Sequence, residues 1–146
     1  IAVMDHGRIS AVNTKHELFD NPNTLAGTLL TGCKNVSRAY ALSDGRLMAE
    51  EWGMELSAVR EVPEDLKYVG IRAHYFERMD GPGENTFLME VVQVIEDTFS
   101  YLVMVRLAGT EHEPLRWELE KKDWLALDRQ SFYLRLPPEK LLLMTE

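Results

Sequence analysis

The sequence predicts a mainly β protein, in which a small OB-like β-barrel follows a strand pair and two short helices. After residue 34, short runs rich in β-branched and aromatic residues alternate with turn formers such as SDG at 43–45 and DGPG at 80–83. Before residue 35, leucines recur at helical spacing between helix-capping residues. Six or so short strands avoid long exposed edges most easily in a closed or partly closed barrel.

The chain opens on a predicted strand, IAVM, which a turn at 5–8 connects to a second short strand over 9–12. A half hairpin of this kind normally completes a sheet laid down earlier in the chain. The sequence has neither an initiator methionine nor a secretory signal. We therefore expect this sequence to be a piece of a longer polypeptide.

Two short helices are predicted between residues 14 and 32. The first starts at a capping box, TKHE at 14–17, and runs through Leu18 and Phe19. The second starts at the Asn21-Pro22 cap and ends at Gly32, with leucines at one-face spacing, namely Leu25, Leu29 and Leu30.

Six β-rich runs follow, and a helical turn or two is predicted over 121–128, before the last run. The runs are NVSRAYAL (35–42), GRLMAEEW (45–52), KYVGIRAHYF (67–76), TFLMEVVQVIE (86–96), YLVMVRLAG (101–109) and SFYLRLPPEKLLLM (131–144). The change of period near residues 32–35 places a domain boundary there, which gives domains 1–34 and 35–146.

The composition is that of a globular protein with an acidic surface. The 146 residues carry 24 acidic and 16 basic side chains, a net charge of -8, so the overall field repels nucleic acid. The longest apolar runs fall well short of the roughly 20 residues that a membrane span needs. The single cysteine, Cys33, cannot form an internal disulfide, which is typical of a reducing cytoplasm.

Known catalytic motifs are missing from the sequence. It contains no Gly-Lys dipeptide, so no P-loop, and no G-x-S-x-G nucleophile elbow. HELFD at 16–20 lacks the second histidine of a zinc-binding H-E-x-x-H motif, and EHE at 111–113 is expected to be a solvated loop. We therefore expect no enzyme activity and no metal site in this chain.

Two donor clusters are candidates for binding an oxyanion. If 67–76 is one strand, alternation places Val69 and Ile71 on the apolar face and Arg72 and His74 together on the other. A guanidinium beside an imidazole supplies directed donors for an oxyanion, although such a pair also occurs on solvated faces or in ion pairs with glutamate. Ser37 and Arg38 form the second cluster. The tryptophans are expected to be core or interface anchors: Trp52, Trp117 and Trp124.

The opening stretch, IAVMDHGRISAVNTKHELFDNPNTLAGTLLTGCKN, resembles the segment just after the switch histidine in ATP-binding subunits of ABC importers. VGIRAHYFE is similar to the entry of the accessory TOBE barrel of these subunits, and FYLRLPPEKLLLM to its last strand. LLTGCKNVSRA is most similar to subunits assigned to molybdate, tungstate or sulfate import. The resemblance implies that 1–34 ends a nucleotide-binding domain and that 35–146 is a TOBE regulatory barrel.

The resemblance also implies partners and ligands. The domain would regulate and dimerise the ATP-binding subunit of an oxyanion importer, with molybdate as the first candidate for the imported ion. The subunit would be a homodimer on the cytoplasmic face of the membrane. The permease subunits would contact the parent nucleotide-binding domain.

ATP and Mg²⁺ would belong to the parent chain, because Walker A, the signature motif, Walker B and the switch histidine are not in this sequence. The T-S-A-R-N motif of small molybdate-binding proteins is absent, and the nearest stretch, NVSRA at 35–39, has its residues in a different order. The alternative is a stand-alone OB-type module that binds a ligand or nucleic acid. The negative net charge is unfavourable for binding nucleic acid.

Overall fold

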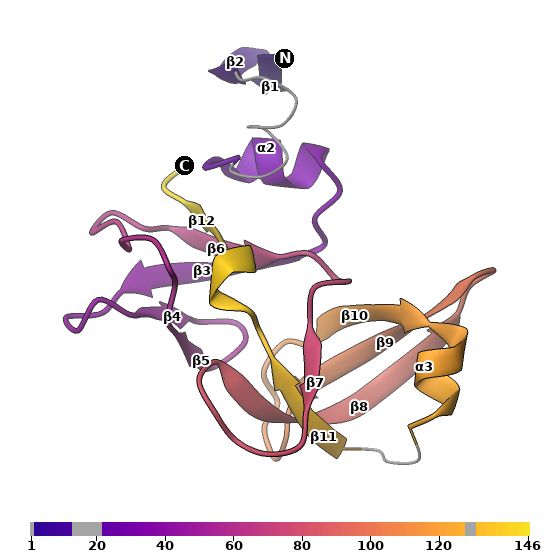
Figure 1. Ribbon diagram of the computed structural model, residues 1–146. Helices are drawn as coiled ribbons and strands as arrows, with labels where there is room; N and C mark the ends of the chain where they lie inside the picture. Colours follow the sequence, from indigo (N-terminus) through magenta and orange to yellow (C-terminus); the bar gives the residue numbers. More distant parts are fainter. Residues whose placement is uncertain (1, 13–21, 128–130) are drawn as a thin grey trace.

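The computed structural model describes residues 2–12, 22–127 and 131–146. The first described element is a hairpin of β1 (Ala2–Asp5) and β2 (Arg8–Val12), as predicted (Figure 1). The predicted helix over 14–19 lies outside the described residues. None of the helices in the described ranges is long and apolar enough to span a membrane.

Two five-stranded antiparallel sheets form the body of the protein (Figure 1). The first sheet has the order β12-β6-β3-β4-β5. Its strands are β3 (Asn35–Ala41), β4 (Leu47–Ala49), β5 (Met54–Leu56), β6 (Tyr68–Ile71) and β12 (Leu142–Met144). The last strand of the chain therefore returns to pair with β6 at the sheet edge.

The second sheet has the order β10-β9-β8-β11-β7. Its strands are β7 (Glu77–Met79), β8 (Thr86–Glu96), β9 (Ser100–Leu107), β10 (Leu115–Glu120) and β11 (Ser131–Arg135). The short helix α3 (Lys121–Leu125) follows β10, within the predicted range, and the 3-10 helix η1 (Pro138–Lys140) precedes β12.

One hydrophobic core joins the two sheets. Leu56 and Ile71 of the first sheet and Val103 and Leu134 of the second are fully buried in it. Burial of an apolar side chain of this size contributes about 1.5–3 kcal/mol, so the shared core holds the sheets together. The mainly β class predicted from the sequence is confirmed.

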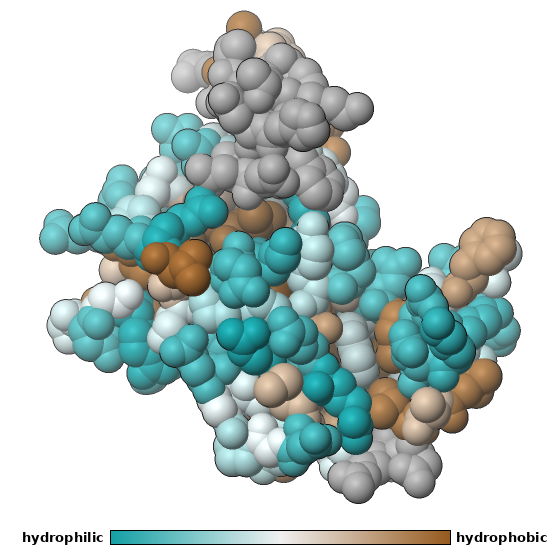
Figure 2. Space-filling model, in the orientation of Figure 1, coloured by the Kyte–Doolittle hydropathy of each residue, from teal (hydrophilic) through white to brown (hydrophobic). Residues whose placement is uncertain are grey.

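The tryptophans divide between the core and its margin. Trp52 and Trp117 are 2% and 5% exposed, so they are core residues and cannot supply the apolar surface of an interface. Trp124 is half-buried and packs its ring 6.1 Å from that of Tyr101. Exposed apolar side chains lie instead at Leu125 of α3 and at Phe99 in the tip of the β8–β9 hairpin, on the side of the molecule where hydrophobic and hydrophilic atoms are mixed (Figure 2).

Two predicted strands are shorter than expected. The run 67–76 ends as β6 at Ile71 and then turns, with the Tyr75 N–H donating to the Arg72 carbonyl (3.2 Å), and β7 of the other sheet starts only after the run, at Glu77. The run 131–144 is broken at Pro137 and Pro138, which cannot donate to a strand ladder. β5, β7 and β10 have no counterpart among the predicted runs.

Helix α2 (Leu25–Leu30) starts later than its predicted cap. Thr24 is the N-cap, and its side chain accepts from the Gly27 N–H (3.1 Å). The helix packs on β12, because the Thr28 hydroxyl donates to the Met144 sulfur (3.0 Å), and this contact turns Gly27 and Thr28 inward. Leu29 and Leu30 are 53% and 63% exposed, so the three leucines do not share a buried face.

Candidate oxyanion site

A cavity of about 320 Å³ lies where the segments after α2 and after β6 meet β9 and β10. We call it the β10 cavity. Its ionisable side chains are Lys34, Arg72, His74, Asp97, Arg116 and Glu118. Three of them are basic and two are acidic, whereas acidic residues outnumber basic ones by 24 to 16 in the whole chain, so this cavity is locally richer in basic groups.

The edge strand β10 forms two hydrogen bonds with Asn35 of β3 and one with the segment after β6. The Asn35 amide donates to the Arg116 carbonyl (2.8 Å) and accepts from the Arg116 N–H (2.7 Å). The Glu118 N–H donates to the Ala73 carbonyl (2.8 Å). Because Lys34 is the neighbour of Asn35, these bonds place Lys34 and Arg116 on the wall of one cavity.

Arg72 and His74 both line the β10 cavity, but not as predicted. Since β6 ends at Ile71, they do not share a strand face, and Arg72 lies inside the protein with 5% of its surface exposed. Its guanidinium donates to the carbonyl (3.0 Å) and hydroxyl (2.9 Å) oxygens of Thr31 at the end of α2. His74 is exposed and packs its ring 4.3 Å from that of Tyr75.

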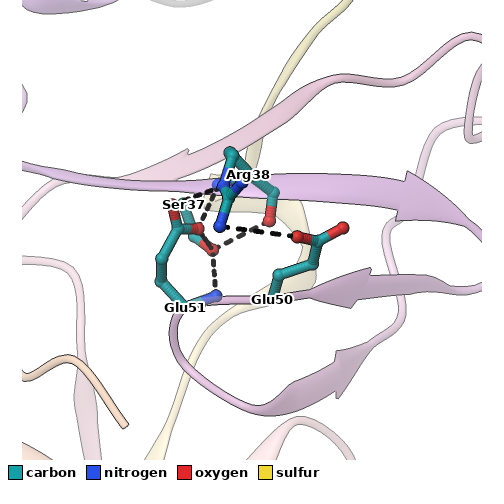
Figure 3. Close-up of polar contacts among 4 residues, drawn as sticks. All are labelled: Ser37, Arg38, Glu50 and Glu51. Carbon is teal, nitrogen blue, oxygen red and sulfur yellow. Dashed lines mark hydrogen bonds and ion pairs between the residues drawn. The ribbon is translucent and has the colours of Figure 1, made fainter.

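Ser37 and Arg38 lie elsewhere, in a cluster with two glutamates (Figure 3). The Ser37 hydroxyl donates to the Glu51 carboxylate (2.8 Å) and accepts from the Glu51 N–H (3.0 Å). The Arg38 guanidinium bonds Glu51 (3.0 Å) and lies 3.8 Å from Glu50. The structure therefore does not bring the two predicted donor clusters together, and carboxylates occupy the second. Its role in anion binding stays a prediction.

The same cluster holds Glu51 in its charged form. Burial by itself raises the pKa of a carboxyl, but hydrogen bonds from Ser37, the Arg38 N–H and the Arg38 guanidinium outweigh it, so the pKa of Glu51 is lowered. The hydrogen bond to Glu51 also raises the pKa of Arg38. The cluster is thus a charge-neutralising contact that connects β3 to the turn after β4.

Sequence reasoning missed Lys34 and Arg116. Neither side chain forms an ion pair with any described residue, whereas Arg46, Arg106 and Arg135 each have a carboxylate partner. Lys34 comes two residues after the helix stop at Gly32, which was the one local signal for it. Arg116 lies on β10, a strand that was not predicted.

The other chemistry-bearing residues have structural roles or lie in solvent. Cys33 is 2% exposed, and burial raises the pKa of its thiol, which keeps it protonated and unreactive. Glu111, His112 and Glu113 are exposed. Within the described ranges, no group of three or more histidine, cysteine, aspartate or glutamate side chains is arranged to hold a metal ion.

A scan against models of protein families finds no match, and a search of curated proteins finds no relative. Among solved structures, the chain is similar to the cytoplasmic molybdate-binding protein ModG, in a crystal form with molybdate bound. The TM-score is 0.60 at 15% sequence identity, over 79% of this chain and 98% of that one. The two proteins share a fold. This likeness confirms the predicted OB-like, mainly β fold class.

Proposed function

We propose that the β10 cavity binds a small tetrahedral oxyanion, with molybdate as the first candidate. The observation that carries this proposal is the concentration of Lys34, Arg72 and Arg116 around one cavity of an acidic chain. The likeness to ModG, which is a molybdate-binding protein, supports the choice of ligand.

The basic residues of the cavity would bind the anion in two ways, as direct hydrogen-bond donors and as a fixed charge. Oxyanions are held in proteins by charge-assisted hydrogen bonds from lysine and arginine. Lys34 and Arg116 are exposed and without ion-pair partners among the described residues, so they can reach a ligand at small cost. Arg72 is held by Thr31, and it would contribute a fixed positive charge at the cavity wall.

We further propose that this binding serves an ABC importer. The resemblance of the opening stretch to an ATP-binding subunit supports a regulatory and dimerisation domain attached to such a subunit. Two copies would pair, and the parent chain would hold ATP and Mg²⁺ and contact the permease at the cytoplasmic face of the membrane. Occupancy of the β10 cavity would then report the concentration of the imported ion.

Calorimetry and thermal unfolding test the binding step with molybdate, tungstate and sulfate. At a hundredfold excess over Kd, a ligand stabilises the folded state by about 2.7 kcal/mol, so the melting temperature should rise. Lys34→Ala and Arg116→Ala should each weaken binding by roughly tenfold or more, because each removes a hydrogen bond to a charged group worth about 1.5–3 kcal/mol.

Lys67→Ala is the matched control, because Lys67 is exposed and lies outside the β10 cavity. It should leave the affinity unchanged. If wild-type protein gives neither heat nor a thermal shift with any of the three anions, the cavity is not a site for molybdate, tungstate or sulfate.

A further inference from the structure

The β10 cavity contains acceptors as well as donors. Asp97 and Glu118 line it together with Lys34 and Arg116, and none of the four has an ion-pair partner within 4.0 Å among the described residues. Asp97 accepts from the Thr98 N–H (2.7 Å), and Glu118 has a 3.4 Å contact from the Ser100 hydroxyl. Opposite charges thus surround the cavity without neutralising one another.

The strand register brings one donor and one acceptor within reach of the same ligand. Arg116 pairs with Met104 and Glu118 with Leu102, so Arg116 and Glu118 lie two residues apart on one face of β10. That spacing is about 7 Å along a strand. A tetrahedral anion with a hydrogen bond of about 2.8 Å on either side spans this distance.

A fully deprotonated dianion is a poor ligand for such a wall, because the carboxylates repel it. An oxyanion that keeps a proton can instead donate its O–H to a carboxylate, in a charge-assisted hydrogen bond. Hydrogen phosphate has such a proton at neutral pH, whereas sulfate and molybdate have none.

We infer that the β10 cavity prefers oxyanions that carry a proton, hydrogen phosphate being the simplest, with Glu118 and Asp97 as acceptors and Lys34 and Arg116 as donors. This inference rests on the proposed function, because it concerns the same cavity. It ranks hydrogen phosphate above molybdate, whereas the likeness to ModG favours molybdate.

The test is calorimetry on the whole chain at pH 7.5 and constant ionic strength, with sodium phosphate and sodium sulfate as probes and molybdate for comparison. Wild-type protein should bind phosphate at least about tenfold more tightly than sulfate. Glu118→Gln and Asp97→Asn should each reduce this ratio, because an uncharged amide accepts the O–H less strongly and no longer repels sulfate. Glu64→Gln is the control, since Glu64 is exposed and outside the cavity.

Each outcome decides the question. Equal affinities in the wild type, or a ratio that neither variant changes, overturn the inference while leaving the oxyanion site in place. Absence of binding for phosphate, sulfate and molybdate alike overturns the proposed function as well. Thermal melts of both variants establish whether they are folded. If Glu118→Gln does not fold, the test relies on Asp97→Asn.

Discussion

Glu51 accepts hydrogen bonds from the Ser37 hydroxyl and from both the backbone and the guanidinium of Arg38. These bonds favour its charged form and lower its pKa from the ordinary value of 4.5. A carboxyl with a lowered pKa stabilises the fold above its unfolded-state pKa, and the stabilisation is lost as the pH falls through the folded-state pKa. Glu51→Gln should therefore cost about 1 kcal/mol at pH 7.

The cost of Glu51→Gln should shrink below pH 4.5, where Glu51 of the unfolded chain binds a proton before Glu51 of the folded protein does. Urea unfolding of both proteins between pH 7 and pH 3 measures this difference, and Glu64→Gln serves as an exposed control. A difference that stays the same over the whole range would show that the charge of Glu51 contributes nothing.

At the scale of one residue, the sequence could predict which types of side chain bind an anion but not where they lie. Arg72 was placed outside by strand alternation, and that failed because the strand stops at Ile71 and Thr31 supplies the acceptors inside. Lys34 and Arg116 meet only because Asn35 holds β10, which is a contact over 81 residues. No local pattern encodes such a contact.

At the scale of the element, local signals predicted well where local chemistry decides. β3, β8 and β9 match their predicted runs closely, since each run is long and rich in β-branched or aromatic residues. β10 was missed because LRWELE carries three charges and follows a polar loop. The division of 131–144 could not be predicted, because only the second sheet and the shared core decide where β11 ends.

The end of α2 is the clearest local signal, and it can be tested. Gly32 has φ +88°, its N–H donates to the Leu29 carbonyl (3.1 Å), and the Cys33 N–H donates to the Thr28 carbonyl (3.2 Å). A side chain there is strained by about 1–2 kcal/mol, although it would meet no atom within 4 Å. Gly32→Ala should lower the free energy of unfolding by that amount.

Gly81→Ala is the matched control for Gly32→Ala. An added Cβ at Gly81 also meets nothing within 4 Å, but the backbone there is outside the left-handed region. This substitution should be neutral or slightly stabilising, because alanine restricts the unfolded chain. Equal effects of the two substitutions in thermal unfolding would refute the role given to the left-handed turn.

At the scale of the whole molecule, two buried asparagines connect the sheets. Asn35, at the start of β3, bonds the backbone of Arg116 in β10 through both ends of its amide. Asn85, just before β8, accepts from the Ser57 N–H (2.8 Å) and donates to the Ser57 (2.7 Å) and Leu136 (3.0 Å) carbonyls. Each amide thus takes the place of a strand neighbour where the sheets meet, and the core fills the space between them.

Because both amides bridge the same two sheets, removing either should weaken the whole fold. Asn35→Ala and Asn85→Gly each leave buried backbone groups without partners, at about 1–3 kcal/mol for each group. Glycine is used at position 85 because φ is +51° there. Asn23→Gly is the control, since Asn23 also has a positive φ (44°) but is exposed and has no side-chain hydrogen bond to a described residue.

Each asparagine variant should still unfold in one transition, at a lower denaturant concentration than the control. Far-UV circular dichroism reports the strands, and tryptophan fluorescence reports Trp52 beside the first sheet and Trp117 in the second. The two signals should coincide, because the sheets share one core and neither can bury its apolar face alone. Separate transitions for the two probes, in the wild type or in either variant, would mean that the amides join two independent units instead of stabilising one.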